Sequence, residues 1–135
     1  MNKYLKLTLL FIAIWFIASV INGLLSTLCI TFLGDKSGSE EALLSFIFSF
    51  IFSIPFVFVI WISGMISMST LKTYDKVYRL LLYETFAVSI AGAFLFRDLF
   101  KEFNGAAIGL EVSVVVSAVT TIMLFRKELK KINTN

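Results

Sequence analysis

Two carboxylates within long apolar stretches, Glu84 and Glu111, are the residues of this sequence with the greatest capacity for chemistry. A charged group at the centre of a membrane-spanning helix costs about 2.5–3.5 kcal/mol on insertion scales, so such a residue usually needs a polar partner or a function. At about 1.5 Å per residue, Glu84 lies only ~7.5 Å beyond Arg79. We therefore expect an interfacial carboxylate, which reaches the headgroups or pairs with Arg126 or Lys127.

Glu111 lies deeper, and two other unusual residues share its depth. Measured from the basic end of each apolar run at about 1.5 Å per residue, Glu111, Asn22 and Pro55 lie ~22, ~24 and ~25 Å into the membrane. Pro55 has no backbone N–H and therefore frees the carbonyl of Ile51. No basic residue within a span is available to Glu111. The sequence thus predicts a polar intramembrane layer made of Asn22, Pro55 and Glu111.

This layer has two interpretations, and the sequence does not decide between them. In the first, Asn22 donates to the free carbonyl of Ile51 and Glu111 adds another interhelical hydrogen bond, so the layer only holds helices together. In the second, the layer is hydrated and Glu111 handles a cation or a proton, because membrane carboxylates often line such paths.

Small and hydroxyl residues recur at four-residue spacing, which lets helix backbones approach closely. The stripes comprise Ser19, Gly23, Thr27 and Thr31; Ser45, Ser49 and Ser53; and Gly109, Ser113, Ser117 and Thr121. Close helix packing is one interpretation of these stripes, and a pore lined by hydroxyls is the other.

The elements that position these residues are four long apolar runs. Of the 135 residues, 59% are hydrophobic and only 16% are charged, whereas soluble domains carry about 25% charged residues. A run of about 18 or more apolar residues suffices to cross a bilayer as a helix. We predict an all-α, polytopic membrane protein with one domain, 1–135, and four transmembrane helices, at about 7–33, 42–71, 80–96 and 106–125. The short connections between them predict an antiparallel bundle.

The basic residues indicate the orientation of this bundle. Nine of the 12 lie on one side of the predicted membrane: Lys3, Lys6, Lys72, Lys76, Arg79, Arg126, Lys127, Lys130 and Lys131. Three lie on the other side: Lys36, Arg97 and Lys101. The positive-inside rule places the first group, and with it both termini, in the cytoplasm. All four tyrosines also fall near that side, where their rings suit the headgroup level. We expect a multi-pass protein of a bacterial inner membrane.

The same residues limit the classes of function. The chain has no histidine, and its only cysteine is Cys29, so a Cys/His metal site or a disulfide is not expected. No nucleophile has a base beside it, which predicts a non-enzymatic protein without a cofactor. The basic residues flank apolar runs, which predicts lipid contact and not nucleic-acid binding.

We expect a subunit or regulator of a membrane assembly that acts through helix–helix association, as a homo-oligomer or with a membrane-protein partner. The alternative is an oligomeric ion or proton channel or transporter that uses Glu111.

Overall fold

The computed structural model describes residues 2–33, 39–71, 74–101 and 107–132. The described residues form helices and no strands. The elements are α1 (Lys3–Leu33), α2 (Ser39–Thr70), α3 (Tyr74–Leu95), α4 (Arg97–Lys101), α5 (Ala107–Leu124) and α6 (Arg126–Lys131). Four of them, α1, α2, α3 and α5, are long and apolar enough to cross a membrane. The predicted all-helical class and its four candidate spans are therefore confirmed.

The helices extend beyond the predicted spans at the end of the bundle that holds the termini. The first helix begins at Lys3 and the third at Tyr74, each several residues before the apolar run starts. Apolar runs identify only the part of a helix that needs lipid, while backbone hydrogen bonding continues into the polar headgroup layer. The segment between the third and fourth spans, expected as a loop, contains the short helix α4.

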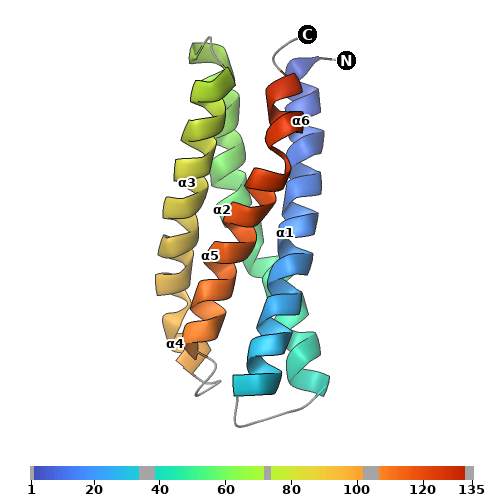
Figure 1. The fold of residues 1–135 in the computed structure, drawn as a ribbon, viewed down its shortest axis with the longest axis vertical. Coiled ribbons are helices and arrows are strands. Elements are labelled where there is room, and N and C mark those ends of the chain that lie inside the picture. The colour runs from blue at the N-terminus through green and yellow to red at the C-terminus, as the bar shows by residue number, and fades with distance from the viewer. Residues whose placement is uncertain (1, 34–38, 72–73, 102–106, 133–135) are drawn as a thin grey trace.

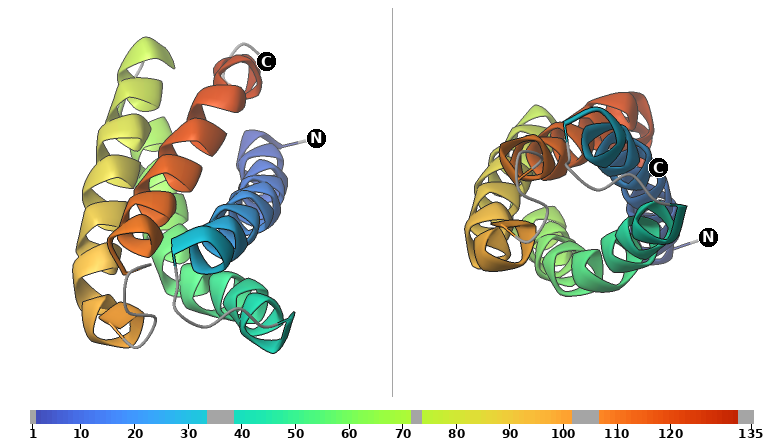
Figure 2. Two further views of the ribbon diagram at one scale, coloured as in Figure 1. Left: turned by 60° about the horizontal axis from the view of Figure 1, so that its bottom comes forward. Right: turned by 90° about the horizontal axis from the view of Figure 1, so that it is seen from below.

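The long helices alternate in direction around the bundle (Figure 1). Helix α1 packs against α2 and α5, and α3 packs against α5 and less extensively against α2. The diagonal pairs, α1 with α3 and α2 with α5, make no close backbone contact among the described residues. Seen along its length, the bundle is a ring of helices (Figure 2).

The half of the bundle near the termini is filled by an apolar core. Leu7 and Phe11 of α1 meet Leu81 of α3 and Ile122 of α5 in one cluster of buried side chains. Gly64 of α2 faces this cluster, where a Cβ would make ordinary van der Waals contacts with Leu81 at 3.4 Å and Leu7 at 3.5 Å. Burying such side chains is worth about 1.5–3 kcal/mol each in water, whereas in lipid it contributes mainly van der Waals packing. This half of the bundle has an apolar interior.

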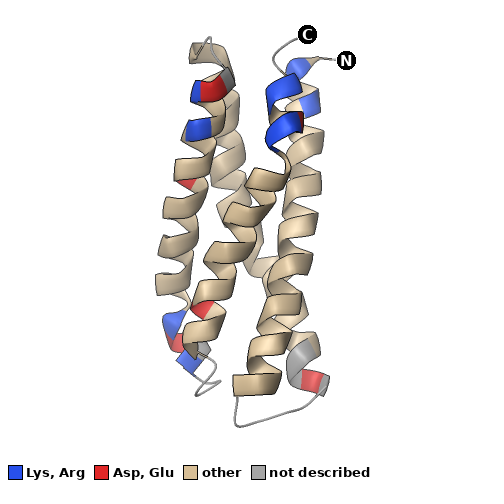
Figure 3. Ribbon diagram, viewed as in Figure 1, with Lys and Arg blue, Asp and Glu red and all other residues tan. Residues whose placement is uncertain are grey.

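The charged side chains gather at the two ends of the bundle (Figure 3). At the end that holds the termini, Lys130 of α6 pairs with Asp75 of α3 at 2.8 Å. The guanidinium of Arg126 lies over the ring of Tyr78, 5.4 Å from its centre. These contacts hold α6 against α3, so the short C-terminal helix packs on the bundle at its basic end.

Candidate functional site

Asn22 is the centre of a polar network within the bundle. Its amide Nδ2 donates to Ser49 Oγ on α2 at 2.9 Å. Its Oδ1 accepts from Ser113 Oγ on α5 at 3.1 Å. The hydroxyls of Ser26 and Ser113 also lie within hydrogen-bond distance, at 3.3 Å. One side chain therefore links three helices, as an interhelical polar group in a membrane is expected to do.

A second part of the network lies two turns away, toward the termini. Trp15 Nε1 donates to Ser53 Oγ at 2.9 Å, and Ser19 Oγ lies 3.1 Å from the same oxygen. Ser53 in turn donates to the carbonyl of Phe50 at 3.0 Å. Ser49 Oγ donates to the carbonyl of Ser19 at 3.0 Å. These bonds join α1 to α2 next to the contact of Asn22 with Ser49.

The structure rearranges the predicted layer of Asn22, Pro55 and Glu111. The Asn22 amide donates to Ser49 and not to the carbonyl of Ile51. Pro55 is within α2, and its side chain is exposed on the outside of the bundle. Equal depth therefore did not mean contact, because the three residues point in different directions around their helices.

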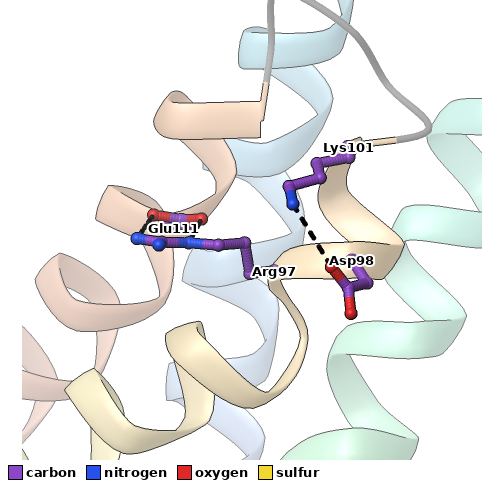
Figure 4. Close-up of polar contacts among 4 residues, drawn as sticks. All are labelled: Arg97, Asp98, Lys101 and Glu111. Atoms are coloured by element: carbon purple, nitrogen blue, oxygen red, sulfur yellow. Dashed lines mark hydrogen bonds and ion pairs between the residues drawn. The ribbon is translucent and has the colours of Figure 1, made fainter.

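Glu111 has a basic partner, contrary to our expectation. Arg97 Nε, at the start of α4, lies 3.0 Å from Glu111 Oε1, and Nη2 lies 3.5 Å from Oε2 (Figure 4). The expectation failed because depth was measured from the distant end of the helix. Arg97 follows the third span directly and lies at the same end of the bundle as the start of α5. Asp98 and Lys101 form a second ion pair beside it, at 3.4 Å.

Glu84 also differs from the prediction. Ser63 Oγ of α2 donates to Glu84 Oε1 at 2.6 Å, whereas Arg126 lies over Tyr78. The second oxygen, Oε2, is buried and has no hydrogen-bond partner among the described residues. Glu84 is thus a carboxylate of the α2–α3 interface. An unpartnered buried oxygen costs about 1–3 kcal/mol, so this residue is a local weak point of the bundle.

The small-residue stripes are used within the bundle. Ser49, Ser113, Ser117 and Thr121 are buried, and Ser45 and Ser53 are partly exposed to a central cavity. Close approach is visible at the glycines. A Cβ at Gly23 would lie 2.7 Å from the Phe46 ring, and one at Gly109 would lie 2.9 Å from Cys29 Sγ. The sequence pattern did not show that Phe46 would lie against Gly23 or Cys29 against Gly109, because these contacts depend on how each helix is rotated about its axis.

The central cavity lies in the half of the bundle away from the termini. Its volume is about 140 Å³. All four long helices contribute hydroxyl or amide groups to its wall: Ser19, Asn22, Ser26, Ser45, Ser49, Ser53, Thr85, Ser89 and Ser117. Phe48, Phe52 and Phe56 of α2, with Phe96, supply aromatic rings. The sequence showed the stripes but not that α3 would complete the wall.

Most hydroxyls of this wall have hydrogen-bond partners. Thr85, Ser89 and Ser117 donate to carbonyls of their own helices, at 2.7, 2.9 and 3.0 Å. Ser and Thr commonly satisfy themselves in this way inside helices. The wall is therefore uncharged and mostly apolar, with hydroxyls already bonded within the protein, which suits a small neutral group better than a bare ion.

Acidic and sulfur groups do not converge in the described part of the chain: no three such side chains lie close enough to hold a metal ion. The chemistry available to the described groups is hydrogen bonding in the cavity, ion pairing at Arg97 and Glu111, and the unpartnered oxygen of Glu84. Comparisons with protein-family models, curated proteins and solved structures find no match to this chain.

Proposed function

We propose that this chain is a non-enzymatic membrane protein with both termini in the cytoplasm, which acts as a self-associating subunit or regulator of a membrane assembly. The uneven distribution of Lys and Arg supports the orientation, since nine lie on the side of the termini and three on the other. The packed apolar half of the bundle supports a role other than conduction through one protomer, because Leu7, Phe11, Leu81 and Ile122 fill its interior.

The surface that we assign to association is the outer face of α2. This helix has 32 residues, yet only 11% of the residues in its most apolar 18-residue stretch are buried, compared with 39% for the corresponding stretch of α3. Ile47, Ile51, Ile54 and Phe58 are exposed along it. Most residues of the small-residue stripes pack inside the protomer, so α2 is the helix with the most apolar surface to offer a second copy.

Disulfide cross-linking in membranes tests this proposal. In a Cys29→Ala background, cysteine is placed at Ile51 of α2 or, as a control, at Phe86 of α3. Both positions are mid-span and about half exposed. We expect oxidation to give covalent dimers with Ile51→Cys and none with Phe86→Cys. Dimers at both positions would indicate random collision, and the absence of dimers at Ile51→Cys would contradict the proposal.

The central cavity favours a second candidate function, transport of a small neutral solute. A volume of about 140 Å³ exceeds the 10–15 Å³ that one water needs, so several waters fit. Glu111 pairs with Arg97 and does not line this cavity, whereas Ser89 does. Ser89 is therefore the residue to substitute in a test of transport. If the cavity transports, Ser89→Leu should stop uptake into liposomes while Glu111→Gln should not. Equal uptake by wild type and Ser89→Leu would argue against transport.

A further inference from the structure

A groove on the outside of the bundle, between α3 and α5, runs up to the Arg97–Glu111 ion pair. Its lining is apolar apart from Glu111 and comprises Ile90, Ala93, Phe94, Val112, Val115 and Val116. Its volume is about 330 Å³. From Ile90 to Arg97 is seven residues, or ~10 Å along the helix axis. The groove is therefore an apolar depression long enough for part of an acyl chain, with a charged head at one end.

The charged head is partly open to the surroundings. The Arg97 side chain is 47% exposed and the Glu111 side chain 20%. The Arg97 guanidinium also lies over the ring of Phe94, 4.6 Å from its centre, which fixes its orientation. A guanidinium has five N–H donors, and the recorded bonds to Glu111 involve only Nε and Nη2. Donors thus remain for a phosphate, which Arg binds in a bidentate manner.

The charges of the described residues around this head balance one another. Figure 4 shows Arg97 and Lys101 beside Asp98 and Glu111, two cations and two anions. A purely anionic headgroup would be attracted by Arg97 and repelled by the two carboxylates. A headgroup with one negative and one positive charge meets a complementary partner for each.

We propose that this groove binds a zwitterionic phospholipid that carries a primary ammonium, of the phosphatidylethanolamine class. The phosphate binds Arg97, the ammonium donates to Glu111, and one acyl chain lies in the groove along Phe94 and Val112. The site lies where the apolar part of α3 ends, which is the depth of the headgroups in a bilayer. It requires only that the bundle be in a membrane and does not depend on the association surface of α2.

Native mass spectrometry of the detergent-solubilised protein tests the proposal with three lipids of identical acyl chains: phosphatidylethanolamine, phosphatidylcholine and phosphatidylglycerol. We expect the wild type to bind them in that order of decreasing affinity, because the quaternary ammonium of the second cannot donate and the third has no cation. Arg97→Gln should lower the affinity for phosphatidylethanolamine about tenfold, the scale of one charge-assisted hydrogen bond. Glu111→Gln should remove the preference over phosphatidylcholine.

A groove-filling variant keeps the test independent of the ion pair. Val112→Trp fills the groove from an exposed position, and Val59→Trp on α2 is the control, since both valines are about half exposed. We expect Val112→Trp alone to weaken lipid binding. Equal affinities of the wild type for the three lipids, a preference for phosphatidylglycerol, or unchanged binding in Val112→Trp would each overturn the proposal, even if Arg97→Gln failed to fold.

Discussion

Replacing Asn22 by leucine should destabilise the bundle by a small and calculable amount. The substitution removes two interhelical hydrogen bonds, to Ser49 at 2.9 Å and from Ser113 at 3.1 Å. Interhelical hydrogen bonds in a membrane protein contribute on average about 0.6 kcal/mol each, with about 1.7 kcal/mol the largest measured. Two average bonds give about 1.2 kcal/mol.

The partners left behind set the upper limit of this cost. Ser49 Oγ still donates to the carbonyl of Ser19 at 3.0 Å, and the single hydroxyl proton of Ser113, no longer shared with Asn22, goes to the carbonyl of Leu110, whose oxygen lies 2.8 Å from Oγ. Neither hydroxyl is left without a partner, so the larger penalty for a buried unsatisfied group does not apply. We therefore expect a loss of about 1 kcal/mol and not of about 3 kcal/mol.

Reversible unfolding in mixed micelles of sodium dodecyl sulfate, followed by circular dichroism, measures this loss. Thr27→Val is the matched control on the same helix, because Thr27 Oγ1 donates only to the carbonyl of Gly23 within α1. It should change the free energy of unfolding by less than about 0.5 kcal/mol. If Asn22→Leu were as stable as Thr27→Val, the network would contribute nothing to stability. A loss above about 3 kcal/mol would mean that Asn22 has partners other than Ser49 and Ser113.

Three further outcomes follow from the same structure. Ser117→Leu should lower the free energy of unfolding by about 1–3 kcal/mol in the same micelle assay, because Ser117 is buried; unchanged stability would mean that the central cavity accommodates the larger side chain. Glu84→Met should raise it by about 0.5–2.5 kcal/mol, because removal of the unpartnered Oε2 gains about 1–3 kcal/mol while loss of the bond from Ser63 costs about 0.6 kcal/mol; no change would mean that this oxygen is hydrated. In a Cys29→Ala background, an impermeant maleimide should label Lys101→Cys in intact cells but Glu128→Cys only after permeabilisation; labelling of Glu128→Cys from outside would refute the proposed orientation.

The charged residues at the ends of the spans show which contacts could be predicted from depth in the membrane alone. The sequence positions of Arg97 and Glu111 were enough to predict the ion pair that the structure shows at 3.0 Å. Arg97 follows the third span and Glu111 lies near the start of the fourth. Measuring depth from both ends of each helix would have placed them together. The partner of Glu84 could not be found in this way, because Ser63 is one of several hydroxyls at a similar depth on α2.

The sequence by itself determined the helical class, the four apolar helices and their alternation, because lipid offers no hydrogen bonds and leaves a long apolar segment only the helix. It also determined which residues lie at similar depth, since the rise per residue is constant. Only the tertiary structure decided that Asn22 meets Ser49 and Ser113, that Pro55 faces outward, and that part of the stripes lines a cavity. Those contacts depend on the rotation of each helix about its axis, and a helix that is apolar on nearly every side carries no pattern that fixes this rotation.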